Sequence, residues 1–264
     1  MNRPRPWADC PRGVLAGLRG VFTDIDDTLT AGGRLDPPAA AALQALRDAG
    51  VPVVAITGRP LGWSRPLAAS WPLAAIVAEN GAVALIPEAG GLRTEYSQDA
   101  ATRADNAQRL RRAAERVQRE VPGACLSQDS EGRETDIAID HSEFVHLDEA
   151  RIAQVVAVMR DEGLNATVSS IHVNGWFGEH TKLSAAHWML QRLFGRELDA
   201  EIGRWAYVGD STNDQAMFAA FPVSVGVANL QRFAAQLRDW PAYITAGERG
   251  AGFAEVAQAL LAAR

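Results

Sequence analysis

The sequence predicts an α/β protein with a doubly wound parallel sheet and an inserted domain of α+β type. Apolar segments at 14–22, 51–56 and 73–78 end in polar residues and alternate with helical patterns, as βα units do. The pattern changes over 82–174 and the βα rhythm returns afterwards. We therefore expect a core formed by residues 1–81 and 175–264, with residues 82–174 inserted as a second domain.

Helix and strand signals define the expected core elements. Asp36 is placed to cap a helix with Pro37 and Pro38 in its first turn, and Gly50 ends it. The expected core strands are 14–22, 51–56, 73–78, 204–208 and 223–227, and the expected core helices are 36–49, 61–70, 181–194, 215–220 and 252–262.

The segment 82–174 combines short strands with two amphipathic helices. Its expected strands are 82–87, 92–97, 124–127, 134–140 and 165–171, and its expected helices are 101–121 and 147–162. This order indicates antiparallel pairing, in contrast to the parallel core.

Composition excludes several classes of protein. A chain of 264 residues that is 47% hydrophobic can bury a substantial core, and none of its apolar runs is long enough for a membrane span. The formal net charge of -6 argues against nucleic acid as the main partner. Cys10 and Cys125 form neither a disulfide framework nor a zinc spacing, so we expect a cytoplasmic protein. The oligomeric state stays open, with a monomer among the options.

Three carboxylates follow the first apolar run. If the strand continues through them, Asp24 and Asp26 lie on one face and Asp27 on the other. Two carboxylates on one face repel each other unless a proton or a cation lies between them. An Asp-rich turn with Thr28 as a helix cap is the plain alternative for this stretch.

Three further polar clusters follow later core elements. Thr57-Gly58-Arg59 ends the second strand, and Asp210 to Asp214 ends the strand expected at 204–208. Lys182 lies at the start of a core helix and is the single Lys in a chain with 25 Arg. A lone Lys is either an accident of composition or the mark of a site that requires a compact ammonium group, where a planar guanidinium does not fit.

Taken in chain order, these clusters resemble the motifs of the haloacid-dehalogenase superfamily of phosphotransferases. The motif positions are Asp24, Asp26, Thr28, Thr57, Gly58, Lys182, Gly209, Asp210, Asn213 and Asp214. Glu79-Asn80-Gly81-Ala82 and the position of the insert resemble the Cof-like, type IIB branch, which includes sugar phosphatases and phosphomannomutases. The resemblance implies a Rossmann-like core with a C2-type cap. Asp27 departs from the pattern, because many relatives have Gly at this position.

Phosphoryl transfer requires an in-line nucleophile and positive charge around the phosphoryl oxygens. Asp24 is the candidate nucleophile, which would form an aspartyl-phosphate, and Asp26 is the candidate general acid and base. Thr57 and Lys182 are left to hold the phosphoryl oxygens. By resemblance, Mg²⁺ is bound by the side chains of Asp24 and Asp210 and by the main-chain carbonyl of Asp26.

Other residues are candidates for substrate binding and positioning. The expected substrate-binding positions are Thr57, Gly58, Arg59, Asn80, Lys182 and Asn213. Asp214 is expected to orient Lys182. From the cap, the candidates for binding the rest of the substrate are Arg133, Glu134, Asp136, His172 and Asn174. Taken singly, each of these cap residues fits an ordinary hairpin-surface or linker position better than a substrate-binding one.

The sequence thus predicts a Mg²⁺-dependent phosphoric monoester hydrolase that acts on a small phosphorylated metabolite, a sugar or polyol phosphate. Two alternatives stay open. A phosphosugar mutase would use the same aspartyl-phosphate and return the phosphoryl group to the sugar. A regulatory or binding protein would keep the fold without catalysis, although the intact Asp24, Asp26, Lys182 and Asp210 argue against it.

Overall fold

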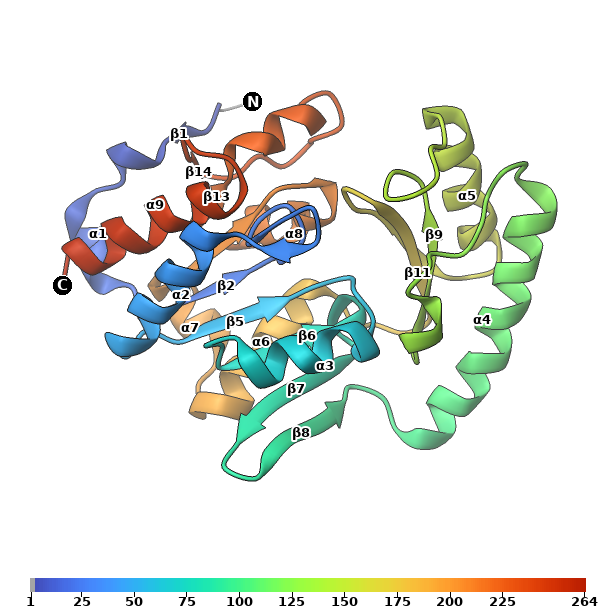
Figure 1. Cartoon of the computed structure of the whole chain (residues 1–264), viewed down its shortest axis with the longest axis horizontal. Helices are drawn as coiled ribbons and strands as arrows, with labels where there is room; N and C mark the ends of the chain where they lie inside the picture. Colours follow the sequence, from blue (N-terminus) through green and yellow to red (C-terminus); the bar gives the residue numbers. More distant parts are fainter. Residues whose placement is uncertain (1–2) are drawn as a thin grey trace.

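The computed structural model of the chain describes residues 3–264. Within that range, nine strands form the main sheet, in the order β1-β14-β13-β12-β2-β5-β6-β7-β8 (Figure 1). All neighbours from β1 to β6 pair in parallel, which confirms the predicted doubly wound core. The strands are β1 (Arg5–Pro6), β2 (Gly20–Thr23), β5 (Val53–Ile56), β6 (Ala75–Ala78), β7 (Val83–Glu88), β8 (Gly91–Tyr96), β12 (Trp205–Gly209), β13 (Val223–Gly226) and β14 (Tyr243–Ile244).

Helices cover both faces of this sheet. The central strand β2 shows why, because Val21 points into one buried apolar cluster and the next residue, Phe22, into the other. The first cluster is closed by α1 (Arg12–Gly17), α2 (Pro37–Asp48), α3 (Leu61–Ser70) and α9 (Arg249–Ala262), and the second by α6 (Lys182–Phe194), α7 (Leu198–Glu201) and α8 (Gln215–Ala220). Over residues 3–264, the structure has no helix with both the length and the apolar character needed to cross a bilayer.

A short hairpin separates β2 from α2. Its strands are β3 (Thr30–Ala31) and β4 (Arg34–Leu35), joined by Gly32 and Gly33. Both glycines have positive φ angles, 57° and 73°, which a two-residue hairpin turn favours. The following helix begins as predicted, with Asp36 at its N-cap position and Pro37 as its first residue.

The inserted unit lies opposite the carboxyl ends of β2 and β5 (Figure 1). Its three-stranded antiparallel sheet has the order β10-β11-β9. Two helices pack with this sheet around its own apolar cluster, and side chains of Asp99 and Asp148 cap them by accepting hydrogen bonds from the amides of Thr102 and Arg151. The elements are α4 (Ala100–Glu120), β9 (Asp136–Asp140), α5 (Glu149–Asp161), β10 (Asn165–Val168) and β11 (His172–Trp176).

The predicted boundaries of the insert, 82 and 174, are wrong at both ends. The hairpin of β7 and β8 extends the edge of the main sheet, antiparallel to β6. The four residues from Val83 to Ile86 are all buried, as expected of a continuous apolar run in a core strand. At the other end, β11 continues to Trp176 and the chain re-enters the core at Lys182. We therefore place the insert between β8 and α6.

Two further elements differ from the prediction. The run 14–22 is not one strand, because α1 extends to Gly17 and β2 begins only at Gly20. Strand β11 was not predicted, since buried polar residues such as His172 and Asn174 interrupt its apolar pattern. Asn174 donates a hydrogen bond to the carbonyl of Gly58 in the core, and His172 lies beside Glu143 on the insert. The pattern of a single segment cannot reveal such long-range contacts.

Candidate active site

Three neighbouring strands of the core carry polar residues at their carboxyl ends. β12, β2 and β5 lie side by side and are followed by Asp210, Asp24 and Thr57. The amide of Asp24 donates to the carbonyl of Val208 over 2.9 Å, which fixes the start of this loop against β12. Because the strands are parallel, these residues share the edge that faces the insert (Figure 1).

Lys182, at the first position of α6, joins two of these loops. Its Nζ lies 2.6 Å from Asp24 Oδ1 and 2.8 Å from Asp214 Oδ1, and the side chain is buried. Burial alone would lower the pKa of Lys182, but the carboxylates of Asp214 and Asp24 raise it above its usual value, so the group stays an ammonium ion. The predicted orientation of Lys182 by Asp214 is visible directly in these contacts.

Asp214 is fully occupied as an anchor. Its Oδ1 accepts hydrogen bonds from Lys182 and from the hydroxyl of Tyr207, and its Oδ2 accepts from the amides of Asp210 and Ser211 at 2.9 and 3.1 Å. A side chain at Gly209 would collide with this carboxylate, which explains the glycine. Tyr207 was not predicted as a site residue, since a Tyr inside an apolar strand indicates a core position.

Asp24, Asp210 and Asp214 each offer a carboxylate oxygen within 4.8 Å of the others. Burial, followed by the charges of Asp214 and Asp26, raises the pKa of Asp24 to about 7 despite the opposing effect of Lys182. Burial and Asp24 likewise raise the pKa of Asp210 well above its usual value. Asp210 Oδ1 is buried without a hydrogen-bond partner among the described residues. Crowded carboxylates with an orphaned oxygen suit a hard divalent cation bound by Asp24 and Asp210, since Asp214 is already satisfied.

The predicted acid and base, Asp26, is paired with Arg59. The guanidinium Nε lies 3.1 and 3.0 Å from the two carboxylate oxygens of Asp26, and one terminal nitrogen lies 3.0 Å from Oδ1. The same guanidinium donates to two residues of the insert, Asp129 at 3.1 Å and Glu143 at 2.8 Å. Arg59 therefore connects the loop that follows β2, through Asp26, to the insert.

An acidic cluster on the insert consists of the carboxylates of Asp129 and Glu143, with His172 beside them. Of these three residues, only His172 was among the predicted ones. His172 Nε2 lies 2.8 Å from a Glu143 oxygen. Burial would raise the pKa of Glu143, but the neighbouring His172 and Arg59 lower it to about 2. The pKa of Asp129 is also about 2, because Arg133 and Ser127 outweigh the effect of burial. Both carboxylates are thus ionised at neutral pH.

The cavity between Asp24 and the insert is nearly closed. Its volume is about 10 Å³, which leaves room for about one water molecule. The lining includes the predicted residues Asp24, Asp26, Thr57, Gly58, Arg59 and Asn213, together with His172 and Asn174 from the insert. This space is smaller than a phosphate ester, so binding of such an ester beside Asp24 would require the insert to move away from the core.

The other predicted substrate residues connect the insert to the core. The carbonyl of Gly58 accepts hydrogen bonds from Arg133 at 2.9 Å and from Asn174 at 3.2 Å. Asp136 is buried among Arg133, Asn174 and Asn80.

Glu134 does not reach the cavity that holds Asp24. Its side chain accepts a hydrogen bond from the exposed hydroxyl of Tyr96, and its amide donates to Glu79. Of the five cap candidates, His172 and Asn174 line the cavity. The other three, Arg133, Glu134 and Asp136, form hydrogen bonds between the insert and the core.

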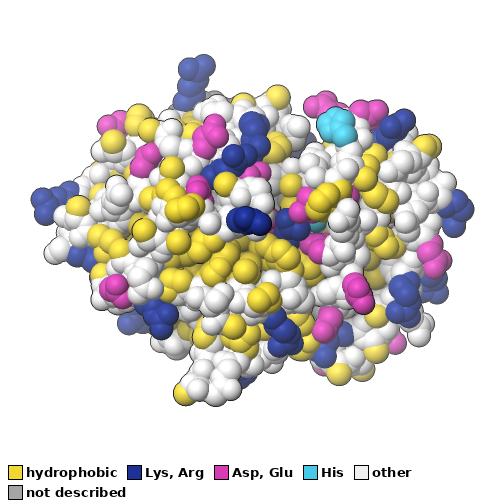
Figure 2. Space-filling model, in the orientation of Figure 1, with side chains coloured by type: hydrophobic (Ala, Val, Ile, Leu, Met, Phe, Trp, Pro, Cys, Tyr) yellow, Lys and Arg dark blue, Asp and Glu magenta, His cyan; other side chains and the backbone are white. Residues whose placement is uncertain are grey.

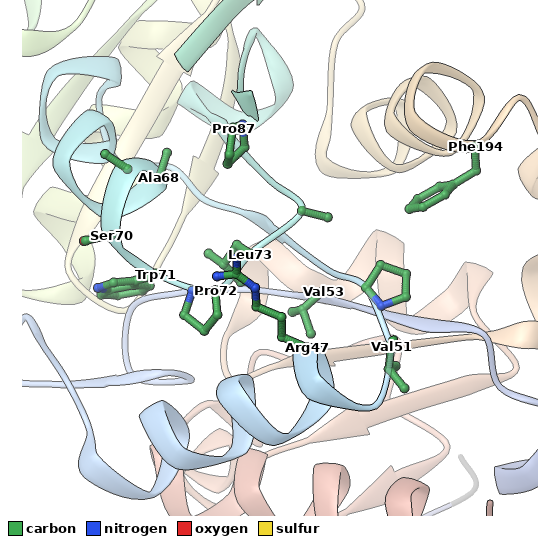
Figure 3. Close-up of a pocket in the computed structure, with 14 residues that line it drawn as sticks. Arg47, Val51, Val53, Ala68, Ser70, Trp71, Pro72, Leu73, Pro87 and Phe194 are labelled. Carbon is green, nitrogen blue, oxygen red and sulfur yellow. The ribbon is translucent and has the colours of Figure 1, made fainter. Parts of the chain in front are cut away.

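A separate hollow lies at the other end of the core. Figure 2 shows hydrophobic side chains gathered on one face of the core, and Figure 3 shows a pocket lined by Trp71, Pro72, Leu73 and Phe194. The volume of this pocket is about 460 Å³. Arg47 is the charged residue among the described side chains of its lining. Apart from Arg47 and Ser70 its lining is apolar, and it contains no carboxylate, so the strand ends are the better candidate for phosphoryl transfer.

The metal-free protein is expected to lose stability as the pH rises from about 4 to about 7. The pKa of Asp24 is about 7 in the folded protein against an ordinary value of 3.8. Its stabilising contribution is therefore fully present below about pH 4 and is lost as the pH rises through 7. Thermal unfolding in EDTA checks this, with Asp24→Asn as the variant whose unfolding temperature should depend less on pH. An equal pH dependence in both proteins contradicts the expectation.

Comparison with known proteins agrees with this geometry. Residues 21–110 match the family model of the haloacid dehalogenase-like hydrolases. None of the curated proteins matches the sequence. The matched segment contains Asp24, Asp26, Thr57 and Asn80, whereas Lys182 and Asp210 lie beyond it.

Solved structures match over nearly the whole chain. A protein of Thermoplasma acidophilum aligns with a TM-score of 0.70 at 16% identity, over 92% of this chain and 98% of its own. The sucrose-phosphatase of Synechocystis, in complex with sucrose and phosphate, aligns with a TM-score of 0.66 at 19% identity, over 92% and 98%. A Plasmodium vivax protein described as a HAD/COF-like hydrolase gives 0.67 at 15% identity, over 96% and 99%. At these identities the likeness is one of fold.

Proposed function

We propose that the chain is a member of the haloacid dehalogenase-like hydrolases, whose family model matches residues 21–110, and that it is a Mg²⁺-dependent phosphatase of a small sugar or polyol phosphate. The observation that carries the proposal is the placement of Lys182 between Asp24 and Asp214, beside the orphaned oxygen of Asp210. This arrangement offers a nucleophile, a fixed positive charge and the donor set for a cation at one point.

The proposed reaction has two steps. A carboxylate oxygen of Asp24 attacks phosphorus, the bond from phosphorus to the ester oxygen breaks, and Asp26 gives that oxygen a proton. Asp26 then takes a proton from water, which attacks the aspartyl-phosphate and releases phosphate with regeneration of Asp24. Lys182 and Thr57 stabilise the phosphoryl oxygens in both steps.

The cation has its own set of ligands in this proposal. The side chains of Asp24 and Asp210 and the main-chain carbonyl of Asp26 would hold Mg²⁺, as the orphaned Asp210 oxygen supports. When bound, Mg²⁺ offsets the repulsion between the phosphoryl oxygens and these carboxylates.

The acidic cluster on the insert supports an uncharged leaving group. Asp129 and Glu143 are ionised at neutral pH and lie near the cavity through their contacts with Arg59. Carboxylates and imidazole accept hydrogen bonds from hydroxyl groups, whereas a second phosphate or a carboxylate on the substrate would be repelled. The same repulsion favours a phosphatase over a phosphosugar mutase, which must hold two phosphates in turn.

The two cysteines, Cys10 and Cys125, are free, which is consistent with our proposal that the enzyme works in the cytoplasm.

A hydrolysis screen with Mg²⁺ tests the proposal. Monophosphates of neutral sugars and polyols are expected to give higher kcat/KM values than bisphosphates, phosphoglycerates or nucleotides, and EDTA should abolish turnover of all of them. Glu143→Gln should narrow the gap between neutral and anionic substrates. Turnover that persists in EDTA, or a preference for bisphosphates, contradicts the proposal.

A further inference from the structure

Asp27 has a backbone conformation that does not suit a side chain. Its φ angle is 54°, in the left-handed region that glycine adopts freely and that Asp adopts only at a steric cost. It is not one of the residues that the proposed mechanism uses. Its contacts therefore indicate what compensates for the strained backbone.

The carboxylate of Asp27 is held by two arginines. Oδ1 accepts a hydrogen bond from Arg249 Nε at 2.9 Å, and Oδ2 accepts one from a terminal nitrogen of Arg232 at 3.2 Å. The main-chain carbonyl of Asp27 accepts a third bond, at 3.0 Å, from the side chain of Asn229. The side chain of Asp27 thus connects the loop that follows β2 to two segments near the carboxyl end of the chain.

Arg232 lies between two carboxylates. The nitrogen that donates to Asp27 lies 3.6 Å from Asp210 Oδ2, too far for a hydrogen bond. Asp210 Oδ2 accepts its hydrogen bond from Asn229 instead, at 3.1 Å. The side chain of Arg232 is about half exposed and its Nε donates to the carbonyl of Asn229 at 3.2 Å, while Asp210 is fully buried.

We propose that Asp27 is a positioning residue that retains Arg232 and so keeps the Asp210 carboxylate available to the divalent cation. A guanidinium paired directly with Asp210 would compete with the cation for the same negative charge. Without the charge of Asp27, Asp210 is the nearest carboxylate to Arg232, and the arginine closes on it. This inference rests on the cation site of the proposed function.

The test is a titration of metal-free protein with Mg²⁺ by isothermal titration calorimetry, which requires no substrate. Asp27→Asn removes the charge while keeping a residue that tolerates the left-handed backbone. It is expected to weaken Mg²⁺ binding by about tenfold. Arg232→Ala should bind Mg²⁺ at least as tightly as the wild type. The double variant Asp27→Asn/Arg232→Ala should recover most of the affinity lost in Asp27→Asn.

Arg249→Ala is the matched control, because it removes the other ion pair of Asp27 and has no recorded contact with Asp210 within residues 3–264. It is expected not to weaken Mg²⁺ binding. Thermal unfolding in EDTA verifies that each variant is folded.

Three outcomes would overturn the inference. They are unchanged affinity in Asp27→Asn, an equal loss in the single and double variants, and an equal loss in Arg249→Ala. The equal loss in the double variant would assign the effect to the charge of Asp27 alone, without Arg232. If the wild-type protein binds no Mg²⁺, the cation site of the proposed function fails and the inference fails with it. The titration of the wild type therefore distinguishes this failure from a failure of the role of Asp27 alone.

Discussion

Asp24→Asn is expected to lower kcat/KM on an aryl phosphate by at least about a thousandfold, equivalent to about 4 kcal/mol of transition-state stabilisation. The amide is a far weaker nucleophile than the carboxylate and a poorer ligand for Mg²⁺, so two functions are lost in one change. The structure also predicts that the variant folds. Lys182 keeps its 2.8 Å ion pair with Asp214, and the crowding of three buried carboxylates is relieved.

Steady-state kinetics with Mg²⁺ in excess measure this effect. Asp48→Asn is the matched control, since it makes the same chemical change on an exposed position of α2. Activity close to that of the wild type in Asp24→Asn would show that another residue attacks phosphorus.

Lys182→Arg is expected to lose at least about tenfold in kcat/KM, the order of 1.4 kcal/mol. The ammonium group lies within 2.6 and 2.8 Å of two carboxylate oxygens in a buried position. A guanidinium is wider and its donors point in fixed directions, so it cannot keep both contacts and also reach the phosphoryl oxygens. The first turn of α6 accepts either residue, so the helix should form normally.

Circular dichroism and thermal unfolding serve as the folding control for Lys182→Arg. The reverse exchange at an exposed site, Arg47→Lys on α2, should leave the kinetics unchanged. Wild-type kinetics in Lys182→Arg would mean that the single Lys of the chain is an accident of composition.

The grouping of the candidate catalytic residues could be predicted because parallel strands bring their carboxyl ends together. Asp24, Thr57 and Asp210 each follow an apolar strand, and this local signal suffices to place them at one edge of the sheet. Lys182 was found by its rarity and by the order of the motifs.

The limits of the insert could not be read from the sequence in the same way. A hairpin such as β7–β8 has the same local pattern whether it joins the core sheet or the insert. The fully buried run from Val83 to Ile86 was the one available sign that it belongs to the core.

The acidic cluster was missed for a related reason. Asp129 and Glu143 contact Arg59 across 70 and 84 residues of sequence, and neither lies in a segment with a periodic pattern. Long-range ion pairs between loops leave no local signal. Burial and charge in the folded chain were needed to show that these residues lie beside Asp26.

The central claim is that the phosphoryl group passes through Asp24. The most direct test is rapid quenching of Asp26→Asn during turnover of an aryl phosphate, whose leaving group needs no proton, followed by mass spectrometry of the peptides. The account predicts one phosphoryl group on the peptide that contains Asp24, removable by hydroxylamine, because loss of the base slows hydrolysis of the intermediate. A phosphoryl group on another residue, or turnover without any covalent phosphate on the protein, would contradict it.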